Sequence, residues 1–274
     1  MMTINCKGKL IDFSTPRVMG ILNITPDSFF DGGKYKNEVE ILSQVEKMLT
    51  EGATFIDVGA YSSRPGAQHI SEEEELKRII PIIELLVANF PEIIISVDTF
   101  RSTVAQKSIA AGAAIINDIS GGKMDANMFE TISKLQVPYI IMHMLGTPKN
   151  MQHAPQYSDV TKEVTSFFAE QIYNLHQLKV NDILIDVGFG FGKTIEHNYK
   201  LLKDLTLFKK LDAPILVGIS RKSMLYKPLE ITAKTALNAT TSANTIALLN
   251  GANILRVHDV KEAMEAVKIV TQLS

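Results

Sequence analysis

The stretch Asp182-Ile-Leu-Ile-Asp-Val-Gly-Phe-Gly-Phe-Gly-Lys193 joins a short apolar strand to a glycine-rich loop, with the carboxylate of Asp186 at the junction. Three alternating glycines contribute little to a hydrophobic core, so this loop is more typical of the floor of a ligand site. The segment therefore predicts a buried strand that carries its chemistry at one end only.

The same arrangement recurs in seven other segments of the chain. Each is a short apolar run that ends in polar residues or glycine: Val18–Leu22 before Asn23, Phe55–Ile56 before Asp57 and Gly59, Ile93–Val97 before Asp98, Ala114–Ile116 before Asn117 and Asp118, Tyr139–Met142 before His143, Ile215–Val217 before Gly218, Ser220 and Arg221, and Ile254–Leu255 before Arg256 and His258. Eight strands with chemistry at their C-terminal ends are expected.

Helical patterns fill the intervals between these strands. The expected helices are 37–51, 71–89, 102–111, 125–135, 159–178, 195–211, 234–250 and 260–273. Ser71 and Glu74 have the spacing of a capping box, and Gly52, Gly112 and Gly251 stand where helix C-termini favour a left-handed residue. Alternating strands and helices favour a parallel sheet with right-handed crossovers.

The spread of polar strand ends over all eight units favours a closed (β/α)8 TIM barrel in the α/β class. An open doubly wound sheet would concentrate ligand chemistry at one switch point, whereas a barrel brings every strand end to its C-terminal rim. Residues 3–13 alternate around Lys7-Gly8-Lys9 and predict an N-terminal β-hairpin that closes the bottom of the barrel. No linker or composition shift divides residues 1–274, so one domain is expected.

Composition favours a small-molecule partner. The 274 residues are 46% hydrophobic with a net charge of -2, whereas nucleic-acid and membrane-surface proteins normally present a basic face. The single cysteine, Cys6, forms no internal disulfide and fits a reducing compartment. The N-terminus lacks the apolar core of a signal peptide, so a cytoplasmic location is expected.

Two long blocks make the pattern specific. Met19-Gly-Ile-Leu-Asn-Ile-Thr-Pro-Asp-Ser-Phe-Phe-Asp-Gly-Gly33 and Ile56-Asp-Val-Gly-Ala-Tyr-Ser-Ser-Arg-Pro-Gly-Ala67 resemble the two signatures of the dihydropteroate synthase family. Further ordered matches are Ser96–Thr99, Ile116–Asp118, Asp186–Lys193, Gly218–Ser223 and Arg256–Val260. The resemblance implies a TIM-barrel transferase that joins 4-aminobenzoate to 6-hydroxymethyl-7,8-dihydropterin pyrophosphate. It also implies Mg2+ as cofactor and release of pyrophosphate in folate synthesis.

A pterin presents adjacent donors and acceptors along one flat edge, which carboxylates and an amide can match. The residues expected to bind it are Asp98, Asn117, Met142, Asp186, Phe191, Gly218 and Lys222. Asp98, Asn117 and Asp118 have a purely structural alternative, in which they cap helices or tie loops. His143 is kept only as a secondary rim residue.

The leaving pyrophosphate requires cations or N–H donors. Arg256 and His258 lie two residues apart on one predicted strand, and with Asn23 and Arg64 they are expected to hold the anion. Asn23 is also the expected Mg2+ ligand. An ion pair between Arg256 and a rim carboxylate is the alternative. Catalysis is assigned to Asp98, Lys222, Arg256 and His258 by an SN1-like displacement. No serine has an evident His/Asp partner, and no covalent intermediate is needed.

The 4-aminobenzoate site needs an apolar slot with an anchor for its carboxylate. The residues expected to form it are Phe29, Ser63, Pro65, Phe191, Lys222 and Ser223, and sulfonamide-like mimics should enter the same slot. Departures from the family pattern at Phe30, Tyr61, Val187, Tyr226 and Ala239 affect loop shape rather than the assigned chemistry.

Two other functions remain open at this stage. A pterin-binding methyltransferase domain would share the barrel and its pterin pocket, and a non-catalytic pterin-binding protein would need no pyrophosphate clamp. Apolar residues at Ile246, Leu248 and Leu249 make a homodimer plausible, although such residues equally suit the core.

Overall fold

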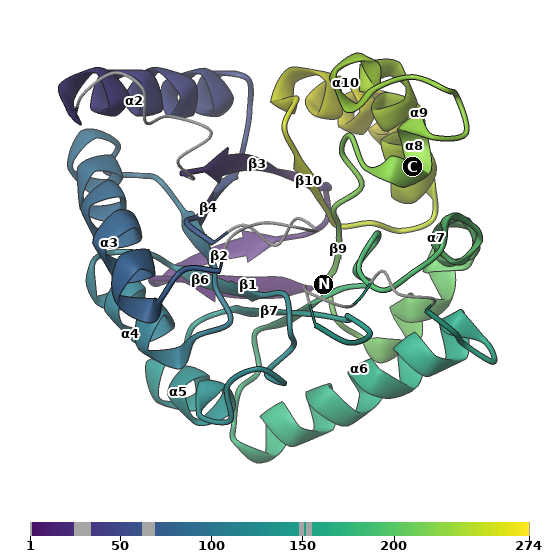
Figure 1. The fold of residues 1–274 in the computed structure, drawn as a ribbon, viewed down its shortest axis with the longest axis horizontal. Coiled ribbons are helices and arrows are strands. Elements are labelled where there is room, and N and C mark those ends of the chain that lie inside the picture. The colour runs from purple at the N-terminus through teal and green to yellow at the C-terminus, as the bar shows by residue number, and fades with distance from the viewer. Residues whose placement is uncertain (1, 25–33, 62–68, 148–150, 152–154, 274) are drawn as a thin grey trace.

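The computed structural model describes residues 2–24, 34–61, 69–147, 151 and 155–273. Parallel strands form a closed barrel in the order β10-β3-β4-β5-β6-β7-β8-β9, with helices around it (Figure 1). The barrel strands are β3 (Arg17–Asn23), β4 (Phe55–Gly59), β5 (Ile95–Asp98), β6 (Ile115–Asp118), β7 (Tyr139–Met142), β8 (Ile183–Asp186), β9 (Ile215–Val217) and β10 (Ile254–Val257). The predicted (β/α)8 barrel is confirmed.

The helices follow the predicted alternation. They are α2 (Lys34–Thr50), α3 (Glu72–Asn89), α4 (Ser102–Ala110), α5 (Met128–Leu135), α6 (Val160–Gln177), α7 (Ile195–Lys203), α8 (Ser223–Tyr226), α9 (Leu237–Leu249) and α10 (Val260–Thr271), with 3-10 turns η1 (Leu205–Leu211) and η2 (Ala233–Thr235). The Ser71 side chain caps α3 by accepting from the Glu74 backbone N–H, which is one half of the expected capping box, whereas the Glu74 carboxylate accepts from Arg78.

Three predicted helices were too long. The 195–211 helix stops at Lys203, because Asp204 separates α7 from the 3-10 turn η1. The Asp204 carboxylate accepts hydrogen bonds from Thr161 of α6 and from Lys200. The 125–135 helix begins at Met128, and the 234–250 helix begins at Leu237 after the turn η2.

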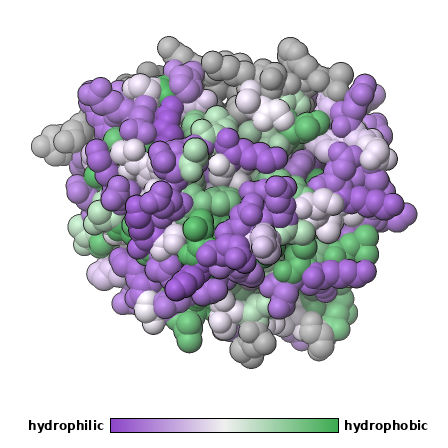
Figure 2. Space-filling view, turned by 90° about the horizontal axis from the view of Figure 1, so that it is seen from below, coloured by the Kyte–Doolittle hydropathy of each residue, from purple (hydrophilic) through white to green (hydrophobic). Residues whose placement is uncertain are grey.

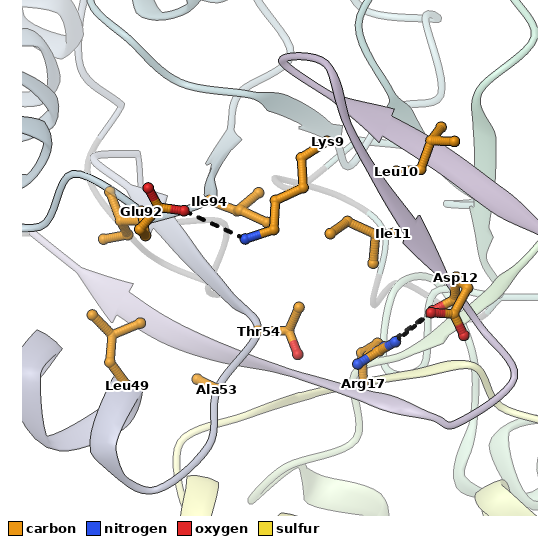
Figure 3. Close-up of a pocket in the computed structure, with 11 residues that line it drawn as sticks. Lys9, Leu10, Ile11, Asp12, Arg17, Leu49, Ala53, Thr54, Glu92 and Ile94 are labelled. Atoms are coloured by element: carbon orange, nitrogen blue, oxygen red, sulfur yellow. Dashed lines mark hydrogen bonds and ion pairs between the residues drawn. The ribbon is translucent and has the colours of Figure 1, made fainter.

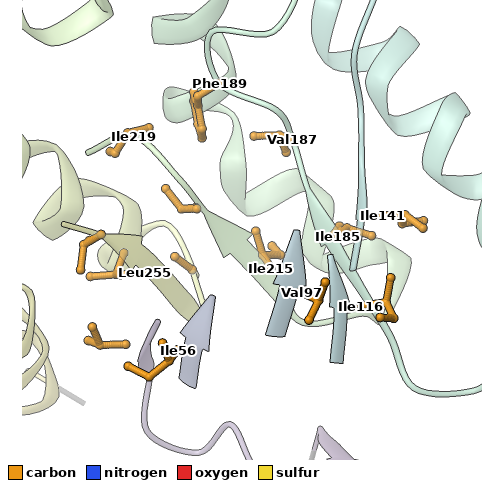
Figure 4. Packing of buried hydrophobic residues seen from close by; sticks show 14 of the residues in the cluster. Ile56, Val97, Ile116, Ile141, Ile185, Val187, Phe189, Ile215, Ile219 and Leu255 are labelled. Carbon is orange, nitrogen blue, oxygen red and sulfur yellow. The ribbon is translucent and has the colours of Figure 1, made fainter. Parts of the chain in front are cut away.

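Strand side chains alternate between the helices and the barrel interior. Figure 4 shows the outward set, including Ile56, Val97, Ile116 and Ile185, which belongs to the core between sheet and helices. Alternation therefore turns the intervening residues inward. At the C-terminal ends of the strands these inward positions hold Asn23, Gly59, Asp98, Asn117, Met142, Asp186, Gly218 and Arg256.

The N-terminal hairpin, β1 (Thr3–Cys6) and β2 (Lys9–Asp12), closes the opposite end of the barrel. Its residues Ile4, Cys6, Ile11 and Phe13 share a buried cluster with inward-facing residues of the barrel strands. The hairpin turn is the predicted one, and Lys7 and Gly8 both have positive φ, at 55° and 86°. The hairpin therefore covers the end of the barrel opposite the polar strand ends.

A cavity of about 400 Å³ lies beside this hairpin (Figure 3). Two ion pairs occupy its edges, Lys9–Glu92 at 3.6 Å and Arg17–Asp12 at 2.9 Å. It lies at the end of the barrel away from the polar strand termini, so we assign no catalytic chemistry to it.

The outer surface is largely hydrophilic on the side shown in Figure 2, with hydrophobic residues in separate groups. None of the helices in the described part of the chain is long and apolar enough to cross a bilayer. On α9, Leu248 is buried, whereas Ile246 and Leu249 are 46% and 55% exposed.

Candidate active site

The carboxylate of Asp57 is the centre of a hydrogen-bonded cluster at the rim. It is fully buried, and its oxygens accept from Ser96 Oγ at 2.6 Å, Asn117 Nδ2 at 3.2 Å and Arg256 Nε at 2.6 Å. Arg256 Nη2 also donates to Asp98 Oδ2 at 3.0 Å. Two carboxylates on neighbouring strands therefore fix the orientation of one guanidinium.

Asp57 was missing from the predicted site residues. A signal was present, because Asp57 interrupts an apolar strand at an inward-facing position, and a fully buried carboxylate requires a partner. The partner, Arg256, lies 199 residues away in the sequence. The alternative interpretation of Arg256 as an ion-pair residue of the rim is therefore correct as far as its contacts are concerned.

Burial dominates the electrostatics of the cluster. Burial raises the pKa of Asp98 to about 7; the charge of Asp57 adds to this shift and Arg256 opposes it. Burial also raises the pKa of Asp186, against the opposing charge of Lys222. For Lys222, burial lowers the pKa to about 8, although Asp186 opposes the shift. The cluster thus contains the carboxylates of Asp57, Asp98 and Asp186 and the cations of Arg256 and Lys222. Among them, Asp98 is the group best placed to hold a proton near neutrality.

The glycine-rich loop after β8 begins with a hydrogen bond from the Gly188 N–H to Asp186 Oδ1 at 2.8 Å. Gly188, Gly190 and Gly192 all have positive φ, at 71°, 82° and 63°. A Cβ on Gly188 would lie 2.0 Å from the carbonyl oxygen of His143. The loop conformation therefore requires glycine there.

Lys222 stands immediately before α8, which begins at Ser223. Its ammonium group donates to the Phe189 carbonyl and lies 4.7 Å from the centre of the Phe191 ring. A Cβ on Gly218 would lie 3.7 Å from Asp186 Oδ2. Lys222, Phe191 and Asp186 are thus assembled on one side of the rim.

An apolar cluster lies at the same end of the barrel. It contains Met142 together with Phe100, Ile119, Met144 and Met151, and Phe191 and Tyr61 pack against it. Met142 is in register with Asp186 on the neighbouring strand. The rim therefore offers an apolar surface beside the carboxylates and Lys222.

His258 follows the end of β10 and contacts Ser220 rather than the Asp57 cluster. Its Nδ1 lies 2.9 Å from Ser220 Oγ, a serine–histidine contact that the sequence did not reveal. The adjacent Asp259 carboxylate is engaged by Arg221, at 2.8 Å. Ser220 and His258 therefore form a pair whose neighbouring acid is engaged by Arg221.

The remaining residues considered from the sequence fall into three cases. Asn23 lies at the end of β3, and its Oδ1 would be 3.8 Å from a Cβ on Gly59, whose other near neighbour is Asp98. Phe29, Phe30, Ser63, Arg64 and Pro65 lie outside the described residues. Asp118 accepts from Ser120, Gly122 and Tyr139, as the loop-tying alternative expected.

Comparison with known proteins identifies the family of this chain. A family model described as pterin binding enzyme matches residues 19–258. The chain belongs to this family. Among residues that depart from the expected family pattern, Val187 is fully buried in the core shown in Figure 4, and the Tyr61 ring packs on Phe100 with ring centres 5.1 Å apart.

Several bacterial dihydropteroate synthases are similar to this chain over nearly their whole length. Dihydropteroate synthase of Escherichia coli K12 is 44% identical over 271 residues, which cover 98% of this chain and 95% of that protein. The Yersinia pestis dihydropteroate synthase structure with a sulfonamide drug gives a TM-score of 0.93 at 43% identity, covering 99% of both chains. The Xanthomonas albilineans dihydropteroate synthase with 4-aminobenzoic acid gives 0.91 at 36% identity, covering 99% of this chain and 97% of that one.

Proposed function

We propose that this chain is a dihydropteroate synthase, which joins 4-aminobenzoate to 6-hydroxymethyl-7,8-dihydropterin pyrophosphate in folate biosynthesis. The observation that carries the proposal is the convergence of Asp98, Asn117, Asp186 and Lys222 on the rim of a chain that is 44% identical to the Escherichia coli enzyme over nearly all of its length. These groups suit the flat hydrogen-bonding edge of a pterin.

The pterin site is proposed on the strand ends. Asp186 supplies acceptors for the N–H groups of the aminopyrimidinone, Asn117 adds an amide, and Lys222 donates to the ring carbonyl or nitrogen. Met142 and Phe191 lie in the apolar surface beside them, and a Cβ on Gly218 would lie in ordinary contact with Asp186 Oδ2, at 3.7 Å, so glycine keeps that contact distance free. Replacing Asp98 or Asp186 by asparagine should weaken pterin binding in calorimetry, and unchanged affinity in both variants would remove this assignment.

Pyrophosphate binding is proposed for Asn23, Arg64, Arg256 and His258. Support for Arg256 is its fixed position at the end of β10, but Asp57 and Asp98 partly neutralise it. The contribution of Arg256 to the free energy of pyrophosphate binding should therefore be at or below the low end of the range of about 1.5–3 kcal/mol typical of a charged hydrogen bond. Arg256→Lys keeps a cation for both carboxylates and removes the planar fork, so it should weaken pyrophosphate binding without unfolding the protein.

A divalent cation is proposed at Asn23. In the part of the chain described, no group of three or more His, Cys, Asp or Glu side chains is arranged to hold a metal ion. A single amide oxygen fits Mg2+, because this ion usually keeps several waters and binds substrate phosphates with few protein ligands. When bound there, Mg2+ would neutralise charge on the leaving pyrophosphate.

The proposed reaction is a dissociative, SN1-like displacement. The bond between the pterin methylene and the pyrophosphate oxygen breaks first, and its electron pair leaves with pyrophosphate. The Asp98 carboxylate balances the cationic pterin, while Arg256 and His258 hold the anion. The amine of 4-aminobenzoate then attacks the methylene and loses a proton.

The slot for 4-aminobenzoate is proposed between Phe191 and the stem of Lys222, with Ser223 as carboxylate anchor. Phe29, Ser63 and Pro65 are proposed to complete it. Sulfonamides should compete for the same slot, as mimics of the aromatic acid.

Partner and location are further proposals. The exposed Ile246 and Leu249 of α9 favour a homodimer, which sedimentation of the wild type and of an Ile246→Asp, Leu249→Asp double variant would test. The single cysteine favours a reducing, cytoplasmic location, which cell fractionation would check.

One assay tests the central proposal. The purified protein is incubated with the pterin pyrophosphate, labelled 4-aminobenzoate and Mg2+, and both dihydropteroate and pyrophosphate are measured, with Asp186→Asn as control. Equimolar products from the wild type are expected. A folded wild-type protein that binds the pterin but forms no product would refute the synthase function and favour the methyltransferase or non-catalytic alternatives.

A further inference from the structure

A buried lysine behind the glycine-rich loop has no role in the proposed reaction as described above. Lys193 Nζ is 3.0 Å from each of four acceptors: His143 Nδ1 and the carbonyl oxygens of His143, Gly188 and Phe191. Lys193 and His143 are only 3% and 6% exposed. One ammonium group thus ties the loop after β8 to the end of β7.

The contacts define the protonation of this pair. Burial lowers the pKa of Lys193 to about 7, although the charge of Asp186 opposes this shift. An ammonium has three N–H donors for the four acceptors, whereas a neutral amine has only two, so the geometry favours the charged form. Burial lowers the pKa of His143 to about 2, and the charge of Lys193 adds to this shift. His143 is therefore neutral, and we assign its Nδ1 as the acceptor from Lys193.

The same loop contacts a second lysine on its other side. The carbonyls of Gly188 and Phe191 point to Lys193, whereas the carbonyl of Phe189 accepts from Lys222. The left-handed glycines allow carbonyls so close in sequence to point to two different partners. The loop is therefore held between two ammonium groups, one buried and one at the site.

We propose that Lys193 and His143 are positioning residues for the 4-aminobenzoate slot. They fix the carbonyls of Gly188 and Phe191 and thereby position the Phe191 ring. The Lys222 ammonium lies 4.7 Å from the centre of that ring. Phe191 and Lys222 also belong to the proposed pterin site, but the carboxylate and amide contacts of that site, Asp98, Asn117 and Asp186, lie at strand ends. Pterin binding should therefore depend less on Lys193 and His143. The inference rests on the proposed synthase function.

Paired substitutions at His143 separate positioning from general stability. His143→Leu fills similar space but removes the side-chain acceptor, whereas His143→Asn places an amide oxygen near the former Nδ1. Lys193→Met removes the ammonium itself. Each variant is compared with the wild type in the Michaelis constants of both substrates, the aromatic acid and the pterin pyrophosphate, and in kcat and thermal unfolding.

We expect His143→Leu to raise the Michaelis constant of the aromatic acid about fivefold or more and that of the pterin pyrophosphate less than twofold. In His143→Asn the Michaelis constant of the aromatic acid should return most of the way to the wild-type value. In folded Lys193→Met this constant should rise more than in His143→Leu. Equal changes in both Michaelis constants, unchanged constants with a lower unfolding temperature, or no rescue by asparagine would each overturn the inference. An inactive wild type would instead refute the proposed function.

Discussion

Replacing Asp57 by asparagine removes the negative charge at the centre of the rim cluster while keeping the shape of the side chain. The buried carboxylate accepts hydrogen bonds of 2.6 Å from both Ser96 and Arg256. Breaking a buried ion pair by removing one partner costs about 3–5 kcal/mol. Arg256 keeps Asp98 as a second partner, so we expect the free energy of unfolding to fall by about 3 kcal/mol, the lower end of that range.

The same substitution should change the pH dependence of activity. The charge of Asp57 contributes to the raised pKa of Asp98, about 7, although burial is the larger cause. Without that charge, and with Arg256 left to Asp98, the pKa of Asp98 should fall. If the Asp98 carboxylate is needed to balance the cationic pterin, kcat/KM rises with pH through about 7 in the wild type and through a lower pH in Asp57→Asn.

The contribution of Asp98 to stability should change with pH in the direction opposite to that of kcat/KM. Because folded Asp98 holds its proton to about pH 7, the folded state binds more protons than the unfolded state above the ordinary aspartate pKa of about 4. This group therefore lowers stability as pH rises between those two values, and Asp57→Asn should reduce that slope.

Urea unfolding at several pH values and kcat/KM for the pterin pyrophosphate from acid to alkaline pH measure both effects. Asp12→Asn is the matched control, since Asp12 pairs with Arg17 at 2.9 Å but their side chains are 40% and 29% exposed. It should change stability much less and leave the pH profile unchanged. An acid limb that stays near pH 7 in Asp57→Asn, or a stability equal to that of the wild type, would refute this account of the cluster.

Three further predictions follow from single contacts. Burial lowers the pKa of Lys222 to about 8, so kcat/KM should fall as pH rises through that value, and Lys222→Arg should abolish this limb; a limb that persists contradicts it. Gly188→Ala should lower the unfolding temperature more than Gly190→Ala, because a Cβ would lie 2.0 Å from a backbone oxygen at Gly188 but 3.4 Å from the Lys222 side chain at Gly190; equal losses would contradict this. Tyr139→Phe removes a buried 2.6 Å hydrogen bond to Asp118 and should cost about 1–3 kcal/mol with both Michaelis constants unchanged, whereas a change in either would give Asp118 a direct role.

Local periodicity was sufficient to predict the barrel. Each strand is an apolar run with a polar end, and the intervening segments have helical spacing, so neither inference required a distant contact. The interruption at Asp204 could not be predicted in this way. No glycine or proline marks it, and one of its stabilising contacts, Thr161 to Asp204, joins residues 43 apart in the sequence.

The predicted site shows where residue type alone is insufficient. Arg256 suggested an anion clamp, because guanidinium groups bind phosphates well, but its structural partners are Asp57 and Asp98. His143 suggested a minor rim residue, and its partner Lys193 was seen only as the end of a glycine-rich block. Both partnerships join different strands or loops, so they follow from the closed barrel rather than from local sequence.

Two inward-facing positions at the rim, Gly59 and Gly218, carry no side chain. Asn23, Gly59, Asp98 and Asn117 are in register on four successive strands, as are Met142 and Asp186 on the next two. A Cβ on Gly59 would make ordinary contact with Asp98 Cβ at 3.4 Å, and one on Gly218 with Asp186 Oδ2 at 3.7 Å. Glycine therefore leaves space directly beside the two carboxylates proposed to face the pterin, so a ligand atom can occupy the volume that a side chain would otherwise fill.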